Sequence, residues 1–242
     1  MLQTLVVADP LADLAQLDGV GSAVEAARAA VDSVLRDRGL RVVSAEQSAA
    51  ALLAGARASA ALTDDPPRWL AGAIRLSTEL VPLSELIRVA PGQAMARAHA
   101  LVARGLVPED DLGRIRGDAA TTARIRGLNE LLTRPTAASG IVLAAVAHAE
   151  LLASGAFDTA NGIVARAVEH LVLVAAGVDP RAALVPEQGH LVLRHSYQIS
   201  LARYREGTVS GVREWLLHCA QALTHGAEAS PLAASPMGRR RD

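Results

Sequence analysis

The stretch with the clearest chemical potential runs from Gly155 to Arg166 and reads Gly-Ala-Phe-Asp-Thr-Ala-Asn-Gly-Ile-Val-Ala-Arg. It joins two apolar runs of helical length, so Asn161-Gly162 falls where the second helix begins. The first backbone N–H groups of a helix have no intrahelical acceptor, and the helix dipole favours an anion beside them. Arg166, one turn later, carries a planar guanidinium that could reach the same anion. The stretch therefore predicts an anion-binding loop in which Asn161, Gly162 and Arg166 are the binding residues.

The same residues also have ordinary structural uses, and these remain open at this stage. Asn161-Gly162 is typical of a helix N-cap or a turn. Phe157 is the only phenylalanine of the chain, and we expect it to anchor the loop in the core. His148 precedes the loop on the first helix, where a satisfied core histidine is the simpler reading. Arg166 lies on an otherwise apolar helix, and a buried arginine needs a partner.

Composition indicates an all-α protein. The 242 residues are 51% hydrophobic but only 2% aromatic, and alanine, the best helix former, is abundant. β-Branched and aromatic runs that mark strands are scarce. The length suits one large domain or two small ones, and no break divides two cores. We expect an N-terminal helical region over 1–90, a helical core over 91–228 and a disordered tail over 229–242.

Charge and motif counts exclude several classes of protein. The net charge of −1 gives no overall field for nucleic acid, and no apolar run is long enough for a membrane span. Cys219 is the only cysteine, so no intrachain disulfide can form, and with no recognisable signal peptide we expect a cytoplasmic protein. The histidine pairs lack the spacing of metal ligands on one helical face, so we predict no metal site.

Local signals mark helix boundaries along the chain. The spacing predicts a helix over 22–38, then one from a Ser44-x-x-Gln47 capping box to about Leu62. Prolines then predict the starts of further helices, among them one at Pro91 and one at Pro108. The apolar runs predict helices over 69–78, 122–132, 139–153, 162–176, 189–205 and 209–224.

The order of these features resembles the Fic (Fido) family, whose core is a helix, a phosphate loop and a second helix. The family's loop reads His-x-Phe-x-[Asp/Glu]-Gly-Asn-Gly-Arg-x-x-Arg. Four of the eight specified positions match here, and they are Phe157, Asn161, Gly162 and Arg166. Judged by element order, including Tyr197, Tyr204 and Trp215 after the loop, the resemblance spans roughly residues 55–225. It implies a Fic-like helical core.

The positions that depart from the family's loop are those that carry its chemistry. The family's histidine takes a proton from a target hydroxyl as it attacks the α-phosphorus of ATP, and Gly155 cannot do this. Its acidic residue holds Mg²⁺, and Thr159 carries no charge, so the resemblance implies a weakened metal site. Ile163 replaces one phosphate arginine. Ala160 replaces the first glycine, a change that we expect to be tolerated while φ stays negative.

A second motif of the family departs in the same direction. Many Fic proteins carry an inhibitory helix with Ser/Thr-x-x-x-Glu-Gly/Asn, whose glutamate pairs with the second arginine of the loop. The matching residues here are Ser59, Thr63 and Asp64, with Thr63 in place of the glutamate. Since Thr63 has no carboxylate, we expect Arg166 to be free for a phosphate, another protein carboxylate or solvent.

Together these residues predict a degenerate Fic-fold protein that is weakly active or inactive. Such a protein would bind ATP, ADP, another phosphate group or a protein partner. One alternative is an active nucleotidyltransferase, moving AMP to protein hydroxyls with His148 or Asp158 as a displaced base. Another is a purely structural helical scaffold that forms a homodimer through an alanine-rich face.

Overall fold

Alanine-rich amphipathic segments form helices throughout the chain, as their composition predicts. The computed structural model describes residues 9–36 and 43–233, and no strand occurs among them. Its helices are α1 (Pro10–Ala15), α2 (Val20–Arg36), α3 (Ala45–Ala61), α4 (Pro66–Thr78), α5 (Leu80–Leu86), α6 (Pro91–Ala103), α7 (Ala119–Thr133), α8 (Gly140–Ser154), α9 (Asn161–Ala175), α10 (Pro186–Val192), α11 (Arg194–Arg205) and α12 (Val209–Glu228).

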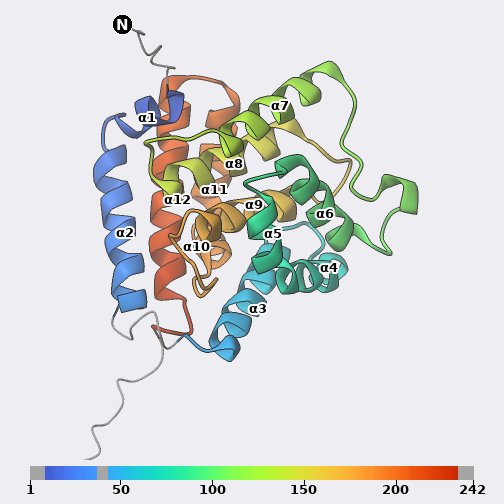
Figure 1. Ribbon diagram of the computed structural model, residues 1–242, viewed down its shortest axis with the longest axis horizontal. Coiled ribbons are helices and arrows are strands. Elements are labelled where there is room, and N and C mark those ends of the chain that lie inside the picture. The colour runs from blue at the N-terminus through green and yellow to red at the C-terminus, as the bar shows by residue number, and fades with distance from the viewer. Residues whose placement is uncertain (1–8, 37–42, 234–242) are drawn as a thin grey trace, which may run out of the picture.

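Two apolar helices, α8 and α9, form the centre of the fold (Figure 1). Both are buried along most of their length, because their sequences are apolar on nearly every face. Helices α3 to α6 cover α9 on one side, and α7 packs on α8. On the other side α12 contacts α2, α8, α10 and α11. The loop between α8 and α9 is therefore held at both ends by the most buried helices.

The helix starts predicted near Ser44, Pro91 and Ser139 are confirmed, whereas α2 begins at Val20, two residues before its predicted start. Ser44 and Gln47 form the predicted capping box, with Ser44 Oγ accepting from the Gln47 N–H at 3.2 Å. Pro91 begins α6, and Ser139 caps α8 through the Ile141 N–H. Such starts can be predicted from sequence, because the side chain that accepts from the first free N–H groups of the helix lies within a few residues of them.

Two of the predicted helices differ from the structure. Pro108 is followed by a single 3₁₀ turn, Glu109–Asp111, and Gly113 then takes a φ of +72° that ends the helical path. The helix predicted over 189–205 is two helices, α10 and α11, which meet at Leu193 with a φ of −95° and a ψ of 28°. The predicted end of the first long helix, α2, at residue 38, lies outside the described residues.

One hydrophobic cluster runs through the described residues on both sides of position 90. It includes Val31 and Leu76 from the N-terminal part and Leu171 and Trp215 from the C-terminal part. The division at residue 90 therefore stays a prediction. In the segment predicted as a tail, Ser230 and Leu232 are buried, and Ser230 Oγ donates to the Ala183 carbonyl at 2.6 Å. Residues 234–242 lie outside the described part.

None of the helices in the described ranges combines the length and the apolarity that crossing a bilayer requires.

The close packing of α10 on α12 gives a test of the fold. A Cβ at Gly189 would lie 1.8 Å from the Ala222 carbonyl oxygen, so Gly189→Ala must push the two helices apart. We expect it to lower the free energy of unfolding by about 1–3 kcal/mol, measured by urea denaturation. Gly127→Ala is the matched control, because a Cβ there meets nothing within 4 Å. This control should leave stability unchanged or raise it by about 0.5–1 kcal/mol. Equal effects of the two changes would contradict the packing argument.

Candidate functional site

The loop between α8 and α9 begins and ends at residues with left-handed backbones. Gly155 ends α8 with a φ of 56° and a ψ of 45°, a conformation that glycine adopts without steric cost. Ala160 precedes α9 with a φ of 56°, and its side chain makes no cap. The condition of a negative φ, under which alanine would replace the family's glycine without cost, is therefore not met. An alanine with this φ costs roughly 1–2 kcal/mol, so surrounding contacts must hold the loop in place.

Asn161 provides two of those contacts. Its Oδ1 accepts from the Phe157 N–H at 2.9 Å, and its Nδ2 donates to the Phe157 carbonyl at 2.5 Å. The Phe157 ring is 1% exposed and stacks on His99 of α6, with ring centroids 4.2 Å apart. The Asn161 side chain thus closes the loop on itself. The backbone N–H of Asn161 has no acceptor among the described residues and stays available to a ligand.

Thr159, at the position of the family's acidic residue, is hydrogen-bonded to His99, a histidine that the sequence pattern does not mark as a site residue. His99 Nδ1 accepts from the Gly113 N–H at 2.9 Å, so its proton lies on Nε2, which donates to Thr159 Oγ1 at 3.3 Å. Burial lowers the pKa of His99 and keeps the ring neutral. Neither ring nitrogen is free to accept a proton from a substrate. His99 therefore positions the loop.

An open pocket lies beside the first turn of α9. Its volume is about 300 Å³, and we call it the loop pocket. The N–H groups of Asn161, Gly162 and Ile163 have no acceptor among the residues that the structure describes. The pocket is lined by Leu62, Thr63, Asp64, Asp65, Arg68, Trp69, Ala160, Asn161, Gly162, Ile163 and Arg166. The predicted binding residues are thus brought together with Thr63 and Asp64 of the inhibitory-type segment.

Arg166 is not free, contrary to the sequence-based expectation. It is 3% exposed, and its Nε and Nη2 donate to the Oγ and the carbonyl of Ser59 at 2.9 and 2.8 Å. Its Nη1 donates to the Tyr197 hydroxyl at 3.2 Å. Ser59 lies in the last turn of α3, where a cation also interacts favourably with the helix dipole. In place of a glutamate, the hydroxyl and carbonyl of Ser59 accept from Arg166.

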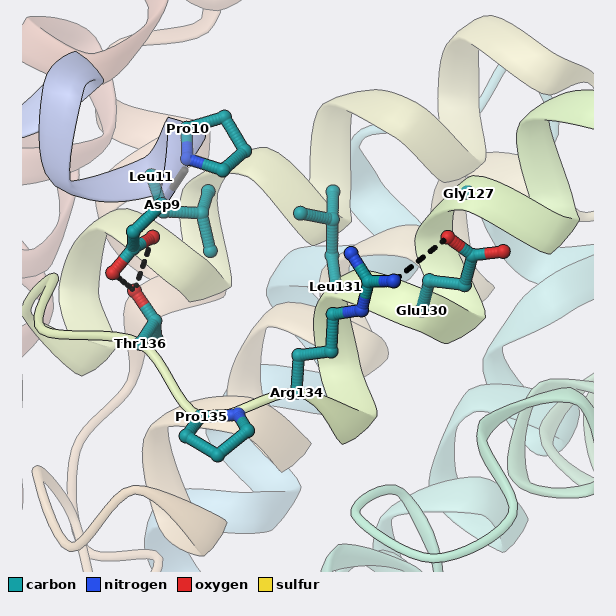
Figure 2. A pocket seen from close by; sticks show the side chains of 9 residues that line it. All are labelled: Asp9, Pro10, Leu11, Gly127, Glu130, Leu131, Arg134, Pro135 and Thr136. Atoms are coloured by element: carbon teal, nitrogen blue, oxygen red, sulfur yellow. Dashed lines mark hydrogen bonds and ion pairs between the residues drawn. The ribbon is translucent and has the colours of Figure 1, made fainter. Parts of the chain in front are cut away.

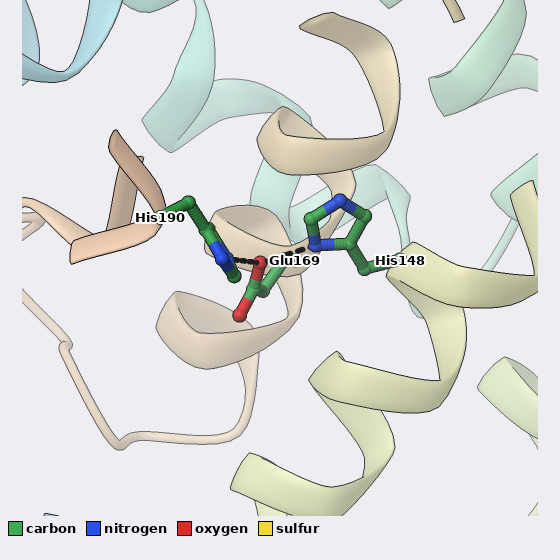
Figure 3. Close-up of side chains that lie close together, drawn as sticks. All are labelled: His148, Glu169 and His190. Carbon is green, nitrogen blue, oxygen red and sulfur yellow. Dashed lines mark hydrogen bonds and ion pairs between the residues drawn. The ribbon is translucent and has the colours of Figure 1, made fainter. Parts of the chain in front are cut away.

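A chain of buried polar groups continues from Arg166 into the core. The Tyr197 hydroxyl accepts from Arg166 and donates to His148 Nε2 at 3.0 Å. His148 Nδ1 then donates to Glu169 Oε2 at 2.5 Å, and His190 Nε2 donates to the same oxygen at 2.7 Å (Figure 3). With the hydrogens assigned in this way, each of these donors has one acceptor. We call Arg166, Tyr197, His148, Glu169 and His190 the core relay.

The relay contains a buried cation, Arg166, and a buried carboxylate, Glu169. Burial lowers the pKa of His148 to about 4 despite the nearby carboxylate, so His148 is neutral at physiological pH. Burial opposes ionisation of Glu169, but the two imidazoles that face it outweigh this effect and lower its pKa. Glu169 therefore carries the negative charge that balances Arg166, with Tyr197 and neutral His148 between them. This network accounts for a cation in a buried position.

The histidines and carboxylate of the relay come close enough to be considered as metal ligands. Their nearest side-chain atoms all lie within 4.8 Å of one another. Ligands around a tetrahedral Zn²⁺ at about 2.0–2.1 Å would lie roughly 3.3 Å apart. The separations from Glu169 Oε2 to His148 and His190, 2.5 and 2.7 Å, instead suit direct hydrogen bonds. The donor set therefore fits the relay better than an ion.

Neither candidate for a displaced base is placed to take a proton in the loop pocket. His148 is fully buried, and both of its ring nitrogens are engaged in the relay. The Asp158 carboxylate is 83% exposed and lies 4.0 Å from Arg116 Nε, beside a different pocket. The backbone N–H of Arg116 donates to the Ala156 carbonyl. In its side chain, Nη1 lies 3.7 Å from the place that a Cβ at Gly155 would occupy. A guanidinium thus lies beside the position where the family has its base.

A larger pocket, of about 630 Å³, lies away from the loop, between the start of α1 and the end of α7 (Figure 2). Its polar groups bind one another, since the Asp9 carboxylate accepts from Thr136 Oγ1 at 2.9 Å and from the Ala137 N–H at 2.8 Å. Arg134 faces Glu130 at 4.0 Å. No set of chemical groups converges on a ligand there, so we place the candidate site at the loop pocket.

The relay can be tested by removing its central hydroxyl. Tyr197→Phe leaves Arg166 Nη1 without its acceptor and His148 Nε2 without its donor, both in the core. We expect a loss of about 1–3 kcal/mol in the free energy of unfolding, measured by urea denaturation. Tyr204→Phe is the control. Its hydroxyl donates to Glu150, a partly exposed carboxylate that also binds Arg124, so the loss should be smaller. Equal losses would argue against the relay.

The buried imidazoles also predict a pH dependence. The pKa of His148 is lowered to about 4 and that of His218, which burial and His190 disfavour as a cation, to about 3. Between these values and 6.5 the unfolded chain binds protons that the folded chain does not, so stability falls as pH falls. Each histidine contributes up to about 1.4 kcal/mol per pH unit. Urea unfolding at pH 7, 6 and 5 should show a shallower loss for His218→Gln. The exposed change His195→Gln should leave the slope as it is; a slope equally steep in both variants would contradict the assignment.

Comparison with known proteins bears on the fold. No family model matches the sequence, and no curated protein matches it either. Among solved structures, this one is similar to that of a Fic family protein from Desulfovibrio desulfuricans G20, with a TM-score of 0.61 and 17% sequence identity. The similarity covers 85% of this chain and 73% of that chain. At this identity the likeness concerns the fold, and it confirms the resemblance inferred from the loop residues: the chain has an all-α, Fic-like fold.

Proposed function

We propose that this chain binds a phosphate-bearing ligand, a nucleotide such as ATP or ADP, in the loop pocket and does not transfer the nucleotide. The observation that carries the proposal is that Asn161, Gly162 and Ile163, whose N–H groups have no acceptor among the described residues, line an open pocket of about 300 Å³. This volume is at the lower end of the range for small-molecule sites. Helix N–H groups of this kind bind phosphate oxygens.

The part of the loop pocket beside α9 favours an anion, whereas the carboxylates of Asp64 and Asp65 elsewhere in the lining disfavour one. The N-terminus of the 15-residue helix α9 contributes a partial positive charge, and the Arg166 guanidinium lines the same wall. Arg166 uses three of its five N–H groups on Ser59 and Tyr197. Its role is therefore a fixed positive charge beneath the phosphate. Exposed Arg68, whose guanidinium lies 5.3 Å from the Trp69 ring centroid, adds a second cation to the pocket lining.

The neighbours of the loop support the proposed lack of transfer chemistry. Gly155 has no side chain to act as a base, and among the described histidines closest to the loop, His99 and His148 have both ring nitrogens engaged. Thr159 binds His99 and contributes no charge for a metal ion. We therefore propose that the ligand binds without requiring Mg²⁺.

Ligand binding is tested by thermal stability. Millimolar ADP or ATP should raise the melting temperature by a few degrees, with or without Mg²⁺, because a ligand that binds only the folded state stabilises it. Thr63→Glu should remove most of this shift, since its carboxylate would enter the loop pocket beside α9 and compete with the phosphate. Thr122→Glu, an exposed change of equal charge on α7, is the matched control and should keep the shift.

The alternatives predict different results in the same samples. No melting shift at millimolar nucleotide would leave a structural scaffold as the better description. A shift that persists in Thr63→Glu would place the ligand elsewhere. Mass spectrometry that detects AMP on this protein, or on lysate proteins incubated with it and ATP, would overturn the proposed lack of transfer.

A further inference from the structure

A second buried polar cluster lies next to the core relay and has no part in the proposed function. His170 of α9 donates from Nε2 to Asp179 Oδ2 at 3.2 Å and from Nδ1 to Glu187 Oε1 at 3.1 Å. Burial alone would lower the pKa of His170, but the two carboxylates outweigh it and raise the pKa to about 10. The ring is therefore an imidazolium between two acidic residues. We call His170, Asp179 and Glu187 the acidic cluster.

One oxygen of the acidic cluster has no partner. Asp179 accepts from His170 and from the N–H groups of Ala183 and Leu184, so both of its oxygens are satisfied. Glu187 is 5% exposed, and only its Oε1 is bound. Its Oε2 has no hydrogen-bond partner among the residues that the structure describes. A buried carboxylate oxygen left in this state costs about as much as a lost charged hydrogen bond.

A hydroxyl nearby lacks the complementary partner. Ser59 Oγ accepts from Arg166 Nε, and no acceptor for its own hydrogen is found in the described part of the chain. Gly55 lies one turn before Ser59 on the same face of α3, and a Cβ at Gly55 would be 2.6 Å from Glu187 Oε2. Glu187, Gly55 and Ser59 thus meet at one place between α3 and α10. A donor without an acceptor and an acceptor without a donor share that place.

Ser59 and Glu187 both line one small cavity. Its volume is about 20 Å³, and Glu187, Gly55, Ser59 and Ser77 contribute to its lining together with apolar side chains of α3, α4, α5 and α9. One water molecule needs about 10–15 Å³ and two to four polar partners. The Ser77 hydroxyl already donates to the Ile74 carbonyl at 2.7 Å, which leaves its oxygen able to accept.

We infer that a single buried water molecule occupies this cavity and bridges Ser59 Oγ to Glu187 Oε2. The water accepts from the Ser59 hydroxyl, donates to Glu187 Oε2 and donates its second hydrogen to Ser77 Oγ. It satisfies the orphaned carboxylate oxygen without moving either helix. The cavity depends on a residue without a side chain at Gly55, because a methyl group there would collide with Glu187.

The bridge joins the acidic cluster to the core relay. Arg166 donates to Ser59, Ser59 donates to the water, and the water donates to Glu187, whose other oxygen accepts from His170. Glu187 is therefore a positioning residue for Arg166, acting through the water and Ser59. This coupling concerns the folded protein alone and does not depend on whether a nucleotide binds in the loop pocket.

A crystal structure of the full chain at high resolution tests the water directly. We expect one density peak within hydrogen-bond distance of both Glu187 Oε2 and Ser59 Oγ. An empty cavity, or a direct hydrogen bond between Ser59 and Glu187, would overturn the inference. A peak with the short oxygen contacts of a metal cation would overturn it as well.

The coupling to Arg166 has its own spectroscopic readout. Glu187→Gln keeps the size of the side chain but replaces the accepting oxygen or reverses its hydrogen bond to the water. The Nε–H resonance of Arg166, assigned by its loss in Arg166→Lys, should shift in the ¹H–¹⁵N spectrum of Glu187→Gln. Glu130→Gln is the control, because Glu130 is exposed on α7 and pairs only with Arg134 among the described residues. An unchanged Arg166 resonance in a folded Glu187→Gln protein would show that the two clusters are not coupled.

Discussion

The burial of the Arg166 charge is the constraint on which the arrangement of the central helices depends. A guanidinium that is 3% exposed is stable only if acceptors surround it and an opposite charge lies close. Ser59 supplies acceptors from α3, and Tyr197 supplies one from α11. The opposite charge, on Glu169, is reached through neutral His148 of α8. Shifting any of these helices would leave a buried donor without its acceptor, so the polar groups fix a packing that alanine-rich surfaces alone would specify weakly.

The form of the loop depends on different residues from those that the family uses for chemistry. The Asn161 side chain binds both backbone groups of Phe157, the Phe157 ring stacks on His99, and His99 binds Thr159 and the Gly113 backbone. None of these contacts requires a base or a metal ion. They hold Ala160 in a left-handed conformation that alanine would not adopt unaided. The proposed anion site can therefore hold its shape without a base or a charged metal ligand, because hydrogen bonds and ring stacking within the loop fix its backbone.

The sequence predicted those features whose physical causes are local. The all-α class followed from composition, the start of α3 from a capping box four residues long, and the Fic-like core from residues within one loop. The core relay could not be predicted, because His148, Glu169 and His190 lie on three helices, 21 residues apart in each step. Each reads in isolation as an ordinary core or surface residue. The break at Leu193 could not be predicted for another reason: the apolar pattern continues across it, so the sequence predicts one helix. Arg166 was recognised as needing a partner, but that partner is a serine 107 positions away.

Gly155, at the position of the family's histidine, has a structural role of its own. Gly155 ends α8 in a left-handed conformation, so it serves as the stop of a buried helix. A histidine at this position would have to adopt the same φ of 56°, at a cost of about 1–2 kcal/mol, or displace the end of α8. Its Cβ would also emerge 3.7 Å from the Arg116 guanidinium, a cation that disfavours a protonated imidazole beside it. Both the backbone conformation and the neighbouring charge thus disfavour a histidine base at this position. A histidine at position 155 would therefore meet a strained backbone and a neighbouring cation at once.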